Sequence, residues 1–284
     1  MEKIKFGPSG IQENYFLKQN RKVSNALVWI KEANLNAFEY CFGKGYNMKI
    51  SAAEQLGKIA VNNNITISVH APYFINLGNP SEESEEKAFN MISKGLDFLD
   101  AFKGEHLVIH IGSQGKEERS VVLERIKTRI LNIVNRLKLK DNFNKKTFIC
   151  LETMGKFSQI GNYKEIIDFC SLDEMLIPTF DFGHINCLLQ GKLNEEEIEN
   201  IFKYSFEKLG EFKTKNSHIH FSKIKFSNKG ELAHLNYDST EFGPDFKDLN
   251  KVIKKLNLTP TIISESTTNM FDDILTIKKI YEEN

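Results

Sequence analysis

Eight short apolar or alternating runs follow one another along the chain, and each is followed by a segment with helical spacing. The runs occupy residues 3–6, 36–42, 65–70, 105–111, 146–152, 175–181, 217–222 and 261–265. This alternation is typical of a parallel sheet wound with helices, and eight strands close a barrel. The expected fold class is therefore α/β, a (β/α)8 TIM barrel. We expect residues 1–284 to form a single domain with its functional mouth at the C-terminal ends of the strands.

The intervening segments carry helix signals. The predicted helices span residues 24–33, 49–63, 83–103, 117–138, 161–171, 195–212, 245–257 and 269–282. Ser51 with Glu54 three residues later predicts a capping box, and Ser81 opens a run of glutamates suited to a first helical turn. Residues 223–244 show no clear periodicity and are expected to form a long loop beside the mouth, where loops of this length tend to be functional.

Composition limits the function classes. Lys plus Arg (38) equals Asp plus Glu (38), so the chain has no overall positive field, and any contact with nucleic acid must be local. The four cysteines form no CxxC pair, and no apolar run approaches the roughly 20 residues that cross a bilayer. We expect a cytoplasmic protein without a membrane partner.

Candidate metal ligands stand where the predicted strands end. In the stretch PTFDFGHINC, residues 178–187, Asp181 and His184 lie three apart at the end of an apolar run, and Gly183 predicts a sharp turn there. Other strands end in the same residue types. The complete set is His70, His110, Glu152, Asp181, His184, His220, His234 and Glu265.

A single histidine at a strand end is usually a hydrogen-bonded structural residue, but a carboxylate ending an apolar strand such as FICLE needs a partner. Imidazoles and carboxylates in this number, with no cysteine in register, suit zinc, manganese or cobalt. His218 and His220 point to the same side of their strand, and we prefer His220 because it lies nearer the mouth. His106 is expected at the opposite end as a structural residue, and Cys150 as core filling.

These residues lie in motifs that resemble the endonuclease IV type of apurinic/apyrimidinic (AP) endonucleases, within the xylose-isomerase-like barrels. The motifs are VHAPYFINLGNP (69–80), HIGS (110–113), CLET (150–153), FDFGH (180–184), HIHFSK (218–223), the loop with His234, and SE (264–265). The resemblance implies a hydrolase that cuts the phosphodiester 5′ to an abasic deoxyribose during DNA repair. The implied partner is double-stranded DNA with an abasic site, and we expect the protein to act as a monomer.

The resemblance also implies two or three zinc ions, with manganese or another divalent ion as alternatives. One ion would be held by His70, His110 and Glu152. A second would be held by Glu152, Asp181, His220 and Glu265, and a third by His184 with His234. Glu152 would bridge the first two ions and act as the catalytic proton acceptor.

One position departs from the family pattern. The family has an aspartate two residues before the loop histidine, where this chain has Leu232, so the third site depends on Glu231 as a substitute. Tyr73 and Phe74 fall where the family presents residues that enter the DNA helix beside the lesion, although packing within the loop explains them equally well. Three lysines near the mouth are candidate phosphate contacts or solvated charges: Lys223, Lys225 and Lys229.

Two other functions are compatible with the same residues. A sugar isomerase or epimerase would use one divalent ion held by Glu152, Asp181, His220 and Glu265, and would leave the remaining histidines without a role. A metal-binding sensor of DNA damage would bind without turnover. Because one barrel fold hosts many reactions, the choice depends on the set of ligands.

Overall fold

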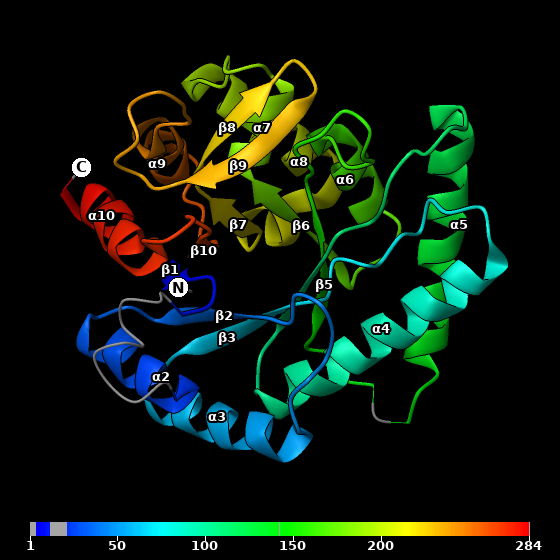
Figure 1. The fold of residues 1–284 in the computed structure, drawn as a ribbon, viewed down its shortest axis with the longest axis horizontal. Coiled ribbons are helices and arrows are strands. Elements are labelled where there is room, and N and C mark those ends of the chain that lie inside the picture. Colours follow the sequence, from blue (N-terminus) through cyan, green and yellow to red (C-terminus); the bar gives the residue numbers. More distant parts are fainter. Residues whose placement is uncertain (1–3, 12–21, 142, 284) are drawn as a thin grey trace.

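The computed structural model describes residues 4–11, 22–141 and 143–283, and its main feature is a parallel sheet wound with helices (Figure 1). The sheet order is β1-β10-β7-β6-β5-β4-β3-β2, and every neighbouring pair is parallel. Its strands are β1 (Lys5–Pro8), β2 (Ala37–Cys41), β3 (Thr66–His70), β4 (His106–Ile109), β5 (Phe148–Glu152), β6 (Leu176–Asp181), β7 (His218–Phe221) and β10 (Thr261–Ser264). All eight predicted strands are confirmed, except that residue 3 lies outside the described residues.

The helices lie around the outside of the strands (Figure 1). They are α2 (Val23–Glu32), α3 (Ile50–Asn62), α4 (Glu82–Ala101), α5 (Arg119–Lys138), α6 (Tyr163–Cys170), α7 (Phe182–Leu188), α8 (Glu195–Lys215), α9 (Phe246–Lys255) and α10 (Met270–Glu283). Their buried faces join the outward faces of the strands in one large apolar cluster. The chain therefore has the predicted TIM-barrel architecture.

The first and second strands bring the sheet nearly to closure. Ser9 and Glu39 form a parallel bridge, and the backbone N–H of Gly10 donates to the carbonyl of Glu39 at 2.9 Å. A side chain at Gly7 could not be accommodated, because its Cβ would lie 2.0 Å from the carbonyl oxygen of Ala37. Glycine at this position therefore allows β1 to approach β2 closely enough for the barrel to be nearly closed.

A second, smaller apolar cluster lies inside the barrel. Val108, Cys150 and Ile177 are aligned on neighbouring strands and form their own cluster, separate from the large outer core. Cys150 is fully buried there, as expected for core filling. Glu152 follows Cys150 by two residues on the same strand, so its side chain leaves the sheet on the same inner side, nearer the mouth.

Three local predictions were wrong. Residues 223–244 are not a simple loop, because β8 (Lys223–Ser227) and β9 (Gly230–Leu235) pair as an antiparallel hairpin. The chain does not merely turn at Gly183 but forms α7, whose N-terminus is capped by Asp181. The predicted capping box at Ser51 is absent, because Ser51 lies inside α3: Lys49 is the N-cap and its carbonyl accepts the first helical hydrogen bonds. A capping box does occur at the start of α6, formed by Asn162 and Glu165.

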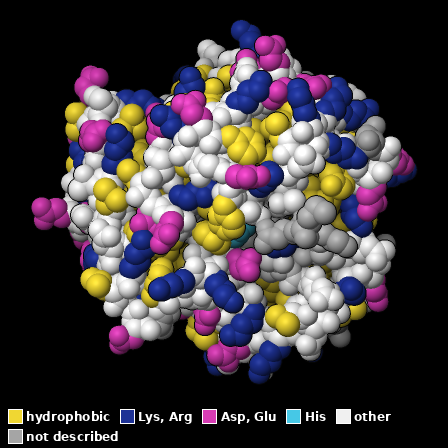
Figure 2. Space-filling model, turned by 180° about the vertical axis from the view of Figure 1, so that it is seen from behind, with side chains coloured by type: hydrophobic (Ala, Val, Ile, Leu, Met, Phe, Trp, Pro, Cys, Tyr) yellow, Lys and Arg dark blue, Asp and Glu magenta, His cyan; other side chains and the backbone are white. Residues whose placement is uncertain are grey.

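The surface carries both signs of charge. On the face drawn in Figure 2, lysine and arginine side chains are interspersed with acidic ones and form no broad region of one sign. Among the described residues, no helix combines the length and the apolar character that crossing a membrane requires.

Candidate metal centre

The C-terminal ends of the strands open into a cleft of about 460 Å³. It is lined by Cys41, Gly43, His70, Tyr73, His110, Glu152, Met154, Lys156, Gln159, His184, Glu231, His234 and Glu265. Three groups of side chains at this mouth could each hold a metal ion, and together they contain all eight candidate ligands predicted from the sequence. A fourth group lies deeper in the barrel.

The first group is His70, His110 and Glu152. The Nε2 atoms of both histidines lie 3.0 Å from Oε2 of Glu152. Burial would lower the pKa of His70, but the hydrogen bond and charge of Glu152 outweigh it and raise this pKa to about 9. Burial would likewise raise the pKa of Glu152, yet the charge of His110 and hydrogen bonds from three histidines hold it well below its usual range. The carboxylate of Glu152 is thus ionised at the centre of the cluster.

The second group shares Glu152 and adds Asp181, His220 and Glu265. His220 Nδ1 lies 3.4 Å from Oε1 of Glu152 and 3.4 Å from Oε2 of Glu265. Oδ1 of Asp181 accepts the backbone N–H of His184 at 2.8 Å. Its Oδ2 lies 3.3 Å from Nδ1 of His184 but is buried without a hydrogen-bond partner among the described residues. Burial, with the negative charge of Glu265, raises the pKa of Asp181 well above its usual value. A buried carboxylate oxygen without a partner is costly, and a cation beside it would remove that cost.

The third group joins His184 to the hairpin residues Glu231 and His234. His184 Nε2 lies 3.5 Å from Oε2 of Glu231, and His234 Nε2 lies 3.8 Å from Oε1 of the same side chain. The hairpin packs against α7 (Figure 1), and all three side chains line the cleft. Glu231 therefore supplies the carboxylate that the resemblance would place at position 232, where this chain has leucine.

A β-bulge accounts for this substitution. Phe226 pairs with Glu231 and Lys225 pairs with Ala233, so Leu232 is an extra residue on β9. In a regular strand, residues three apart point to opposite faces, but one bulged residue restores them to the same face. Glu231 and His234 can therefore both face His184, while Leu232 is 58% exposed.

Three histidines at the mouth each form a hydrogen bond through Nδ1 to a neighbouring group of the protein. Nδ1 of His70 bonds to the carbonyl of Ala71 at 2.8 Å, and Nδ1 of His184 to the carbonyl of Thr153 at 2.9 Å. Nδ1 of His234 lies 2.9 Å from the hydroxyl of Ser222. In all three, Nε2 remains directed at the carboxylates. Outer hydrogen bonds of this kind fix the tautomer of metal-binding histidines.

The structure separates the two histidines of β7. His218 lies below the mouth, where its Nδ1 is 3.1 Å from Nδ1 of His106 and its Nε2 is 3.0 Å from Oε2 of Glu39. His220 reaches the mouth carboxylates, in agreement with the preference for it. Glu39 was missed by the sequence reasoning, although a glutamate within the apolar strand Ala37–Cys41 is itself a signal of a buried partner.

Two further residues of the cleft were also missed. Cys41 is in register with His70 and lines the cleft, so the expectation that no cysteine stands in register was wrong. Its thiol makes a 3.0 Å contact with the hydroxyl of Ser9 and belongs to no ligand group among the described residues. Lys156 is an exposed lysine of the lining.

The other candidate contacts lie at the rim. Tyr73 and Phe74 follow β3 directly, are 50% and 60% exposed, and have ring centroids 5.3 Å apart. Tyr73 lines the cleft. The ammonium of Lys223 instead bonds to the carbonyl of Ser239 and lies over the Tyr237 ring, and Lys223 is not among the residues that line the cleft.

Comparison with known proteins shows relatives along nearly the whole chain. MJ0133, an uncharacterized protein of Methanocaldococcus jannaschii, is 31% identical over 262 residues that cover 89% of this chain and 90% of that protein. A protein named probable endonuclease 4 from Mycoplasma genitalium is 24% identical over 268 residues, 90% of this chain and 87% of that one.

Solved structures share the fold. Endonuclease IV from Thermus thermophilus matches with a TM-score of 0.69 at 16% identity, covering 99% of this chain and 98% of that chain. A D-tagatose 3-epimerase-like protein matches with a TM-score of 0.68 at 19% identity, covering 99% and 96%. At these identities the likeness concerns the fold alone. The model of one family, described as the xylose isomerase-like TIM barrel, matches residues 27–280, and the chain therefore belongs to that family.

Proposed function

We propose that this chain is a metal-dependent AP endonuclease of the endonuclease IV type, which hydrolyses the phosphodiester 5′ to an abasic site in double-stranded DNA. One observation carries the proposal: the mouth gathers three ligand groups, and Glu152 belongs to two of them. A sugar isomerase or epimerase that uses one ion needs only the group of Glu152, Asp181, His220 and Glu265. The name of the Mycoplasma genitalium relative points in the same direction.

The donor set fits divalent ions. It consists of imidazole nitrogens and carboxylate oxygens, the ligand types of zinc and manganese. Oδ2 of Asp181 lies among them and forms no hydrogen bond, although Nδ1 of His184 is 3.3 Å away, and a bound cation would satisfy this oxygen. We assign one ion to His70, His110 and Glu152, a second to Glu152, Asp181, His220 and Glu265, and a third to His184, Glu231 and His234.

When bound, divalent ions would neutralise the charge of the phosphodiester and make a water molecule more acidic. Glu152 is placed to act as the catalytic base, since its two oxygens face different ligand groups and either can accept a proton from the attacking water. The ammonium of Lys156 at the rim can contact a neighbouring DNA phosphate. Because Glu152 and Asp181 are buried, we expect a phosphate held in regular stacked duplex to stay out of their reach.

An incision assay tests the function. Metal-replete protein should cut a duplex with one synthetic abasic site, leaving a 3′-hydroxyl and a 5′ deoxyribose phosphate. The undamaged duplex should react roughly 10²-fold more slowly or worse, because extruding a paired base costs a few kcal/mol and about 1.4 kcal/mol corresponds to a factor of ten. The measurement is the rate of single-strand cleavage on denaturing gels. Metal-replete protein that leaves the abasic strand intact contradicts the proposal.

The sugar-epimerase function is the second candidate, since the four-ligand group is complete and the D-tagatose 3-epimerase-like protein shares the fold. The same preparation should therefore be incubated with a panel of ketoses. Epimerisation or isomerisation without incision would transfer the assignment to that class. Binding of abasic DNA without turnover of either substrate would instead identify a sensor.

The third ion is expected to be the weakest, because its carboxylate comes from a bulged hairpin strand. Glu231→Ala should lower the affinity of one ion by about 10-fold or more, since changes in groups that support a metal cost 10–100-fold. Chelator titration followed by elemental analysis measures this. Leu232→Ala, on the same strand but 58% exposed, is the matched control and should leave all affinities unchanged. Equal effects of the two variants would remove Glu231 from the site.

Tyr73 and Phe74 are proposed to fill the space beside the lesion. Their replacement by alanine should weaken binding of abasic duplex by about 1–3 kcal/mol each, the range for a base–aromatic stack. Metal content should remain unchanged. Phe212→Ala removes a similarly exposed ring, 57%, that borders a pocket with His106 at the opposite end of the barrel, and should have no effect. Binding is measured with catalytically inactive protein by fluorescence anisotropy.

A further inference from the structure

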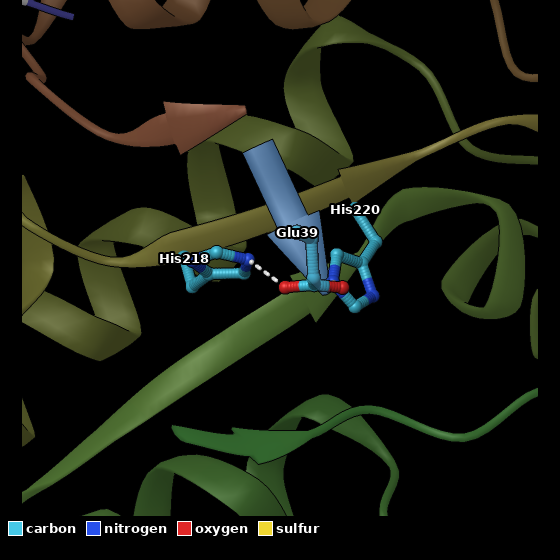
Figure 3. Close-up of side chains that lie close together, drawn as sticks. All are labelled: Glu39, His218 and His220. Atoms are coloured by element: carbon cyan, nitrogen blue, oxygen red, sulfur yellow. Dashed lines mark hydrogen bonds and ion pairs between the residues drawn. The ribbon is translucent and has the colours of Figure 1, made fainter. Parts of the chain in front are cut away.

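Glu39 is a fully buried carboxylate that lies beside His218 and His220 (Figure 3). Three donors face it. The hydroxyl of Ser68 lies 2.8 Å and Nε2 of His218 lies 3.0 Å from its Oε2, and Nε2 of His220 lies 2.9 Å from its Oε1. Figure 3 shows the carboxylate between the two imidazoles, with His218 on one side and His220 on the other. A carboxylate this deep must be bonded on both oxygens to offset its desolvation.

The contact with His220 is close but not aligned as a hydrogen bond. Oε1 of Glu39 and Nε2 of His220 are both buried, and neither has another hydrogen-bond partner. Among the described residues, each of these two atoms therefore has the other as its candidate hydrogen-bond partner. A proton on Nε2 of His220 would face Oε1 of Glu39 across 2.9 Å, so the two atoms can serve each other as donor and acceptor.

His220 is oriented opposite to the other mouth histidines. His70, His184 and His234 each make a hydrogen bond through Nδ1 and present Nε2 to a carboxylate of the cluster. Nδ1 of His184 also lies 3.3 Å from Oδ2 of Asp181. His220 presents Nδ1 to Glu152 and Glu265 and has Nε2 on Glu39. Only the tautomer protonated on Nε2 leaves the lone pair of Nδ1 free for an ion, and this is the tautomer that a carboxylate at Nε2 selects.

We propose that Glu39 is a positioning residue for the metal centre: its carboxylate accepts the Nε2–H of His220 and fixes the imidazole with Nδ1 facing Glu152, Asp181 and Glu265. Ser68 and His218 hold the other oxygen, and His106 in turn holds His218. The inference rests on the metal set of the proposed function, but not on which reaction that set performs.

The same three side chains have ligand atoms within 4.8 Å of one another, so an ion bound by Glu39, His218 and His220 is the competing explanation. It fits less well. His220 would have to serve two ions through its two nitrogens, and Oε2 of Glu39 already receives two hydrogen bonds. Glu39, His218 and His220 are also completely inaccessible to solvent.

The test compares Glu39→Ala and Glu39→Gln with wild-type protein, each loaded with zinc alone. We expect both variants to weaken one ion by about 10–100-fold in competition with a chromophoric chelator, the range for loss of an outer-shell partner. The glutamine variant keeps the volume of the side chain and tests the charge if the alanine variant does not fold. Ser205→Ala is the control, because it removes an equally buried hydroxyl that bonds to Thr214 within α8 and does not contact Glu39 or His220, and it should change zinc affinity less than about threefold, well below that range.

A second readout separates positioning from general destabilisation. In ¹⁵N-histidine spectra of the zinc-loaded protein, the Nε2–H of His220 should exchange slowly with water and show the downfield shift of a hydrogen-bonded proton in the wild type and in Ser205→Ala. It should lose both signatures in Glu39→Ala. Unchanged affinity together with an unchanged His220 signal in both Glu39 variants overturns the proposal. The proposal is also overturned if wild-type protein binds an additional ion that is lost equally in Glu39→Ala and His218→Gln, because that result would identify a metal site in the interior.

Failure of the proposed function is distinguishable from failure of this inference. Wild-type protein that binds zinc but does not cut abasic DNA refutes the nuclease and leaves the role of Glu39 measurable by affinity. Wild-type protein that binds no zinc at the mouth refutes both.

Discussion

Glu152→Gln should reduce incision at abasic sites on the order of 10³-fold or more, the scale of loss when a group that acts on the reacting centre is removed. Glu152 belongs to two ligand groups, and its Oε2 lies 3.0 Å from Nε2 of both His70 and His110. The glutamine side chain keeps the shape but removes the charge that both groups share, and an amide cannot accept the proton of the attacking water. The loss should appear in kcat, measured at saturating duplex.

The fold of this variant should be retained, because the strands around position 152 bury their outward faces in the large apolar core. Circular dichroism and metal analysis check this point. Glu54→Gln, the same chemical change on the exposed surface of α3, is the matched control and should act like wild type. Near-normal turnover by a metal-replete Glu152→Gln protein would exclude Glu152 from catalysis.

Removal of metal should abolish incision and also destabilise the protein. At free ion 1,000 times above Kd, each ion contributes about 4 kcal/mol. With roughly 2–4 °C of Tm per kcal/mol for a chain near this size, loss of even one such ion should lower Tm by about 8–16 °C. Scanning calorimetry before and after chelation measures the change, and elemental analysis should find two or three zinc equivalents per chain in the untreated protein.

The difference in Tm between loaded and metal-free protein should widen as pH rises from about 6.5 to 9. In the metal-free cluster the pKa of His70 is raised to about 9 and that of Asp181 is raised well above its usual value. Groups with raised pKa bind more protons in the folded state, so the stability they contribute is lost as pH rises through the folded pKa. Metal displaces these protons, and its binding therefore strengthens with pH. A Tm difference independent of pH, with one ion or none per chain, would contradict the multinuclear site.

Local sequence periodicity was sufficient for the barrel and for most of the candidate site. Strand residues point alternately to two faces, so an apolar run that ends in a carboxylate or histidine indicates both the strand and the place of the polar group at its end. His70, Glu152 and Asp181 were found in this way, and the structure brings them to one mouth. The hairpin β8–β9 was missed because its pattern is interrupted by a bulge and only partly buried.

The sequence by itself determined which side of each strand a residue faces, since that follows from a period of two. The sequence could not determine how deep in the barrel a side chain lies, or which side chain from the opposite strands it meets. His218 and His220 share one face, and only the packing of β2 against them shows that one reaches the mouth and both meet Glu39. Glu231 replaces the expected ligand at Leu232 only because the bulge shifts the alternation. These features depend on register and on strands far apart in the chain, so tertiary structure alone decided them.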